Sequence, residues 1–154
     1  MSAIAERLLE LGIELPQPSQ PVANYVPFVR AGDLLFIAGQ LPRWNGELRY
    51  IGKLGREFGV VEGQKAARLC GLNILSHLRV ALDDNLDRVA RCVRVSGFVN
   101  SDPAFENQPT VVDGVSDLMV QVFGDAGRHA RTAVGVSALP GSVAIEVEAT
   151  FEVR

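Results

Sequence analysis

The spacing of apolar residues predicts three helices of different length. Between residues 62 and 84 apolar side chains recur every three or four positions, which is typical of a helix with one buried face. A second helix is predicted between about residues 111 and 123, ahead of two glycines that end it. A short helix over residues 2–11 is predicted to end at Gly12, and Pro16, Pro18 and Pro21 then make an extended connector.

Alternating apolar and polar positions predict the strands. Residues 25–30 and 34–39, joined through Ala31-Gly32-Asp33, have the pattern of a β-hairpin. In the strand predicted over residues 89–99, the core-facing positions are expected to be Val93, Val95, Gly97 and Val99. The remaining strand predictions are a possible short strand at 47–51 and a terminal hairpin formed by 131–138 and 143–153.

The last predicted strand shows most clearly where the core lies. One set of alternating positions is apolar and is expected to face the helices: Val143, Ile145, Val147, Ala149, Phe151 and Val153. The other set carries Glu146, Glu148, Thr150 and Glu152. Two main helices can cover only one face of such a sheet, so the polar face must meet water or another subunit. The expected class is α+β, a sheet with two helices packed on one face.

Strand pairing within the terminal hairpin yields a hypothesis for a site. If the valines of 131–138 share the apolar face, Arg131 lies across from Thr150 and close to Glu146 and Glu148, on the polar face. Two small residues are placed on that same face, Ala133 and Gly135. The sequence therefore predicts a small polar pocket with an arginine and carboxylates at its floor.

Composition and charge narrow the function. The 154 residues have the length of one domain, 1–154, with 1–20 forming the N-terminal helix and the Pro-rich connector. A net charge of −3 and 6% aromatic residues argue against a nucleic-acid partner. Neither a signal peptide nor a membrane-spanning run is evident, so a cytoplasmic location without a membrane partner is expected.

Motifs for cofactors and metals are missing from the sequence. Cys70 and Cys92 have neither metal-ligand nor disulfide spacing, and both are expected to be small buried side chains. No glycine-rich phosphate loop and no Gly-x-Ser-x-Gly elbow occurs. The expected site therefore uses no cofactor and no metal.

Five residues are candidates for a site, and four of them have a plainer interpretation. Arg131 could bind a small carboxylate through its planar fork, or form only a surface ion pair with Glu148. Glu146 could hold a water for acid–base chemistry, or belong to a solvated strand face. Tyr25 could offer its hydroxyl to a ligand or simply pack, and Gly39 could admit a ligand or only make a turn. His129 is expected at the pocket rim.

His77, by contrast, is expected on the surface of the longest helix, and no second histidine or cysteine near either histidine supports a metal site.

Several segments taken together resemble one known family. Tyr25 and the segment Gly-Asp-Leu-Leu-Phe-Ile-Ala-Gly-Gln-Leu-Pro at 32–42 resemble the first hairpin of the Rid/YjgF family, also called endoribonuclease L-PSP proteins. Residues 130–136 (Ala-Arg-Thr-Ala-Val-Gly-Val), Leu139-Pro140 and residues 143–149 resemble its C-terminal signature. The resemblance runs from about Tyr25 to the end of the chain, and Gly-Arg-His-Ala-Arg is similar to a longer subgroup of about 150 residues.

The resemblance implies a fold, an assembly and a reaction. It implies a chorismate-mutase-like (bacillus type) mixed sheet, assembled as a homotrimer with a ligand cleft at each subunit boundary. It implies hydrolysis of reactive 2-enamino and 2-imino acids to 2-oxo acids and ammonia. On the matching positions, Arg131 would bind the substrate carboxylate and Glu146 would position water. Tyr25 and Gly39 would line the pocket.

The chain departs from the family pattern at three places. Ala38 stands where many members have Ser, Ala133 where many have Cys, and no residue aligns without a gap with the usual helix Asn. Two other functions therefore stay open. One is a trimer that binds a small carboxylate without turnover, as a metabolite sensor. The other is a ribonuclease, against which the net charge of −3 speaks.

Overall fold

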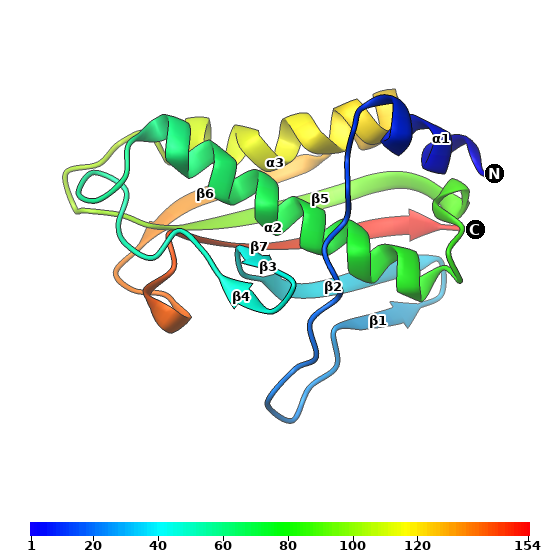
Figure 1. Ribbon diagram of the computed structural model, residues 1–154, viewed down its shortest axis with the longest axis horizontal. Coiled ribbons are helices and arrows are strands. Elements are labelled where there is room, and N and C mark those ends of the chain that lie inside the picture. The colour runs from blue at the N-terminus through cyan, green and yellow to red at the C-terminus, as the bar shows by residue number, and fades with distance from the viewer.

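The computed structural model of the chain describes residues 1–154 as a mixed β-sheet with two long helices side by side on one face (Figure 1). This confirms the expected α+β class. The helices are α1 (Ala3–Glu10), α2 (Val60–Ala81) and α3 (Gln108–Phe123), with 3-10 turns at Leu86–Arg88, Gly124–Gly127 and Pro140–Ser142. The strands are β1 (Phe28–Ala31), β2 (Leu34–Gln40), β3 (Arg43–Trp44), β4 (Glu47–Leu48), β5 (Val89–Asn100), β6 (Ala130–Val136) and β7 (Ile145–Val153).

The strand order of the main sheet corrects one prediction. The order is β1-β2-β7-β5-β6, so β5 lies between β6 and β7, and the predicted terminal hairpin is wrong. β6 pairs in parallel with β5, while the other neighbours are antiparallel. One face of strand β7 is apolar along its whole length. The central position between β2 and β5 buries that face most completely. The alternation of buried and more exposed residues in β7 is as predicted.

The predicted core face of β5 holds from Val95 onward but not at Val93. Pairing with β7 shifts between Cys92 and Arg94, which is a β-bulge. The extra residue brings Cys92 to the buried face and leaves Val93 only partly buried. As expected, both cysteines are buried and free, and burial raises the pKa of the Cys92 thiol to about 12. Such thiols are poor nucleophiles.

Helices α2 and α3 cross very closely, because glycine lies at the contact. A Cβ added at Gly114 of α3 would lie 2.1 Å from the backbone oxygen of Gln64 in α2. Only glycine permits this approach, and it lets both helices lie flat on the same sheet face. No helix of the protein is long and apolar enough to cross a membrane.

The connector between α1 and β1 covers a face of α2 that was predicted from the sequence to be exposed. It crosses α2 on its way to β1 (Figure 1), and Ser76 Oγ donates a hydrogen bond to the Pro16 carbonyl at 2.6 Å. His77 is consequently only 2% exposed, which corrects its expected place on the helix surface.

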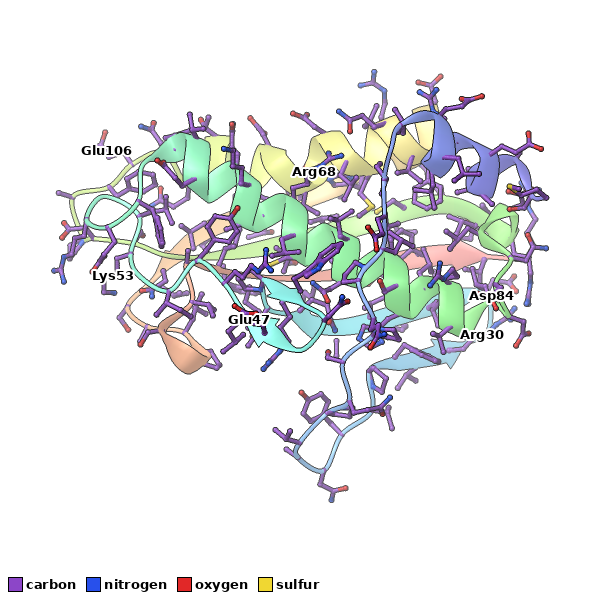
Figure 2. All side chains as sticks on the ribbon, in the orientation of Figure 1. Arg30, Glu47, Lys53, Arg68, Asp84 and Glu106 are labelled. Carbon is purple, nitrogen blue, oxygen red and sulfur yellow. The ribbon has the colours of Figure 1, made fainter.

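Lys53 lies at the end of the molecule opposite Asp84 and Arg30 (Figure 2). Its Nζ donates to Asn100 Oδ1 and to the Ser137 carbonyl, both at 2.6 Å. These bonds tie the loop before α2 to the end of β5 and to the segment that leaves β6.

Candidate functional site

Arg131 lies on the helix face of the sheet, not on the polar face. It pairs with Val95 of β5, whose side chain is buried in the core. Residues paired across neighbouring strands share a face, so the guanidinium turns toward α3. There Nη1 donates to Asp113 Oδ1 at 2.7 Å and to Ser116 Oγ at 3.3 Å. The predicted register was wrong because it assumed that β6 pairs with β7.

His129 belongs to the same cluster, and its contacts define its tautomer. Nδ1 lies 2.7 Å from the Gly127 carbonyl, which can only accept, so Nδ1 carries the proton. Nε2 is then an acceptor, and the Ser116 hydroxyl 2.9 Å away donates to it. Ser116 Oγ in turn accepts from Arg131. Burial, above all, lowers the pKa of His129, which favours this neutral form.

Ala133 is the next residue of β6 on the same face as Arg131. It pairs with Gly97 and packs, partly buried, against the edge of the core. Together with Asp113 and Ser116, these residues form what we call the arginine half-site: Asp113, Ser116, His129, Arg131 and Ala133. The half-site lies at an edge strand and leaves 25% of the Arg131 side chain exposed.

Glu146 lies elsewhere, at the start of β7, in contact with Gly39. Its side chain is on the sheet face opposite the helices, which we call the open face. A Cβ added at Gly39 would lie 3.0 Å from Glu146 Cδ and 3.1 Å from Oε2. The absence of a side chain at Gly39 therefore lets the carboxylate lie against the β2 backbone. Burial raises the pKa of Glu146, and the neighbouring Glu148 carboxylate adds to the rise.

Tyr25 joins Gly39 along a small cavity at the end of β2. Tyr25 is 54% exposed. Glu146, Gly39 and Tyr25 form what we call the carboxylate half-site.

The two half-sites do not meet within one chain. Arg131 and Glu146 are on opposite faces of the sheet, and β5 runs between their strands. The structure therefore places Gly39 against Glu146 and beside the cavity that Tyr25 lines, and separately brings His129 together with Arg131 and Ala133. The predicted single pocket with an arginine and carboxylates at one floor is not formed.

Asp113 and Ser116 were missed by sequence reasoning. They are three residues apart, which places both on one side of α3. Nothing in their spacing shows that this side faces Arg131, because that depends on how α3 lies over β6. No group of three or more His, Cys, Asp or Glu side chains is placed to hold a metal ion.

The chemistry open to the two half-sites is simple. A guanidinium with free N–H groups can bind a carboxylate in a bidentate way, and a partly buried carboxylate can hold a water and accept its proton. These are the two functions that hydrolysis of a small anionic molecule requires.

Comparison with known proteins places the chain among relatives of the same length. A family model described as "YjgF/chorismate mutase-like, putative endoribonuclease" matches residues 5–147. The chain is 47% identical over 152 residues to Protein TCP17 of Trypanosoma cruzi, covering 98% of this chain and 94% of that protein.

Two solved structures are similar over nearly their full length. Protein Atu1372 of Agrobacterium tumefaciens, described as having unknown function, gives a TM-score of 0.92 at 42% identity, covering 98% of this chain and 92% of that one. A "putative endoribonuclease" from Shewanella oneidensis gives a TM-score of 0.94 at 34% identity, covering 97% of this chain and 99% of that one.

Proposed function

The chain belongs to the YjgF/chorismate mutase-like family, as its resemblance to Rid/YjgF proteins indicated, and from that premise we propose that it hydrolyses 2-enamino and 2-imino acids. The products are 2-oxo acids and ammonia. The reaction takes place without a cofactor, at sites that two subunits of a homotrimer complete.

The observation that carries the proposal is the complementarity of the two half-sites. Both hydrogen bonds that Arg131 donates use Nη1, which leaves Nε and Nη2 for a ligand carboxylate. Glu146 lies partly buried on the open face against Gly39, and Gly39 lines a cavity together with Tyr25. Each half-site supplies one function and lacks the other, so a second copy of the chain would complete both.

The open face of the sheet supports such an assembly. It carries partly exposed apolar side chains on paired strands, among them Val29 and Phe36, which are 53% and 45% exposed. Val134 on β6, at the other edge, is 41% exposed. Exposed apolar side chains at both edges of a sheet face are stabilised when another subunit covers them.

In the proposed reaction Arg131 binds the substrate carboxylate and fixes the orientation of the C=N bond. The protonated imine is already electrophilic, so the protein needs only to orient water and shield the site. Glu146 accepts a proton from the water as its oxygen bonds to C2 and the C=N π electrons move to nitrogen. The proton then passes to nitrogen, and ammonia leaves as the C–N bond breaks. The C2 hydroxyl gives its proton to solvent as the carbonyl forms.

The environment of Glu146 suits that role. A base works best when its pKa lies near the operating pH, and burial raises the pKa of Glu146 in that direction. The missing side chain at Gly39 leaves the space that this carboxylate occupies.

The proposal is tested by trapping imines before they hydrolyse. An amino-acid oxidase generates 2-imino acids in situ, and semicarbazide captures those that escape the protein. The wild-type protein is expected to suppress trapping and Arg131→Ala is expected not to. Arg128→Ala is the matched control, because Arg128 is nearby but pairs only with Asp125 at the surface. Wild-type protein that suppresses no trapping would overturn the proposal, and binding of 2-oxo acids without turnover would favour the sensor function.

A further inference from the structure

A second feature of the molecule lies next to the carboxylate half-site and has no part in the steps above. A cavity of about 70 Å³ lies between the connector, α2 and the end of β2. Tyr25 and Gly39 line it, so it opens beside the site where the imine would be held. Arg43 and His77 also line it, together with residues 19–22 of the connector.

The connector that roofs this cavity is fixed on both sides. Ser76 of α2 donates a hydrogen bond to the Pro16 carbonyl at 2.6 Å. On the other side, the Gln17 N–H donates to Asn45 Oδ1 in the β3–β4 turn at 2.9 Å. The connector is therefore held at Pro16 and Gln17, just before Ser19, the first of its residues that lines the cavity.

The floor of the cavity holds a buried nitrogen without a partner. His77 is 2% exposed, lines the cavity, and its Nε2 makes no hydrogen bond. Asn73, one turn earlier on α2, has an unpartnered Oδ1. Buried polar atoms are nearly always paired, so an orphaned one beside a cavity points to a group that is bound there. Burial lowers the pKa of His77, so the imidazole is a neutral hydrogen-bonding group.

The cavity lining also carries a positive charge that no carboxylate neutralises. Arg43 is the one permanently charged residue that lines it, and no lining residue is a carboxylate. Its side chain donates only to the Gly46 carbonyl, at 3.4 Å, and forms no ion pair. Asn73 Nδ2 donates to the Arg43 carbonyl at 2.7 Å, which fixes this residue against α2. A lining that includes an arginine without an ion pair, a neutral imidazole and amide groups, and no carboxylate, is complementary to a carboxylate.

From this geometry we propose that the cavity receives the side chain of the substrate, and that it selects 2-imino acids with a short acidic side chain such as those of aspartate and glutamate. The inference rests on the proposed function, since Tyr25 and Gly39 belong to both sites. A volume of about 70 Å³ has room for a few waters, and so for a side chain of about as many heavy atoms.

The proposal is tested by comparing acidic and neutral substrates in the trapping assay. D-aspartate oxidase generates the imines of aspartate and glutamate, and D-amino-acid oxidase generates the neutral imine of 2-aminobutyrate. The wild-type protein is expected to favour the acidic imines by about tenfold to a hundredfold in kcat/KM, the range that a hydrogen-bonded charge contributes. Arg43→Gln is expected to remove that preference and to change the rate on the neutral imine only a few-fold.

Two further variants show whether the preference belongs to this cavity. Arg49→Gln removes an exposed arginine from the same loop that does not line the cavity, and is expected to keep the preference. His77→Phe keeps an aromatic side chain but removes both ring nitrogens, and is expected to reduce the preference several-fold.

A binding measurement separates failure of this inference from failure of the proposed function. Calorimetry compares 2-oxoglutarate with 2-oxobutyrate, which are stable and need no turnover. Hydrolysis of imines with no acidic preference, or with a preference that Arg43→Gln leaves intact, overturns the inference and keeps the proposed function. Arg43-dependent binding of 2-oxoglutarate without turnover keeps the cavity as an acid-binding site and overturns the enzyme. If the protein neither hydrolyses imines nor binds 2-oxoglutarate through Arg43, both the inference and the proposed function are overturned.

Discussion

Asp113 holds the guanidinium of Arg131, through a hydrogen bond of 2.7 Å from Nη1 to Oδ1. The bond joins α3 to the edge strand β6 and directs one side of the fork toward the helix. It also explains how a long flexible side chain at a sheet edge keeps one position. We therefore treat Asp113 as a positioning residue for Arg131.

Replacing Asp113 should weaken activity far more than stability. Asp113→Ala is expected to lower kcat/KM about tenfold, because Arg131 is no longer fixed, while unfolding changes by about 1 kcal/mol or less, as for other part-exposed pairs. Asp113→Asn keeps an acceptor oxygen and should stay within a few-fold of wild type. Imine trapping and urea unfolding measure the two effects. Equal losses in both variants would show that the charge, and not the position, matters.

Glu146 should set the acid limb of the pH profile. Its pKa is raised by burial, so the carboxylate becomes protonated, and inactive as a base, at a higher pH than an exposed glutamate. We expect kcat/KM to fall with decreasing pH while still above the ordinary value of 4.5. Glu146→Gln should remove this limb and cost about 10²-fold or more in kcat. An unchanged profile in Glu146→Gln would assign the limb to another group.

Gly39→Ala tests the contact between β2 and Glu146. The new Cβ would meet Glu146 Cδ at 3.0 Å, so the carboxylate must move by a few tenths of an ångström. A tenfold or larger loss of kcat is expected, since misplacement of about 1 Å can cost about 10²-fold. In the Glu146→Gln background the same change should cost little, and a double-mutant cycle measures this coupling. Additive effects would disconnect the two residues.

The buried His77 and the partly buried His129 should make stability depend on pH. Burial lowers the pKa of His77 and of His129 below 6.5, so below that pH the unfolded chain binds protons that the folded chain does not. Stability is therefore complete above about pH 6.5 and falls as the pH decreases below it. His77→Phe should flatten part of this slope and leave stability near pH 7 unchanged or up to about 1 kcal/mol higher, because an unpartnered nitrogen is removed. Urea unfolding across this range measures it, and an unaltered slope would contradict the assignment.

Local patterns were enough to predict the main elements and their buried faces. The helical period of α2 and the alternation in β7 are dictated by one-sided burial, and the structure confirms both. The hairpin of β1 and β2 was also predictable, because a glycine separates two strand patterns. In the structure Gly32 adopts a positive φ of 60° at this turn.

Strand neighbours and covered helix faces could not be predicted in this way. Alternation places a side chain on a face of its own strand but does not tell which strand lies beside it, so Arg131 was placed on the wrong face. His77 was placed on the surface because the connector that covers it is far away in sequence. Both errors concern contacts between distant segments, which a local period does not encode.

The most direct test of the account is to mix two inactive variants. Arg131→Ala keeps an intact carboxylate half-site, and Glu146→Gln keeps an intact arginine half-site. When the two variants are refolded together in equal amounts, each intersubunit site receives an intact arginine half-site in about half of the cases, and independently an intact carboxylate half-site in about half. About a quarter of the wild-type rate of imine hydrolysis should therefore return. Each variant alone should stay inactive. A mixture as inactive as its components, from folded protein whose wild type is active, would contradict the claim that two chains complete the site.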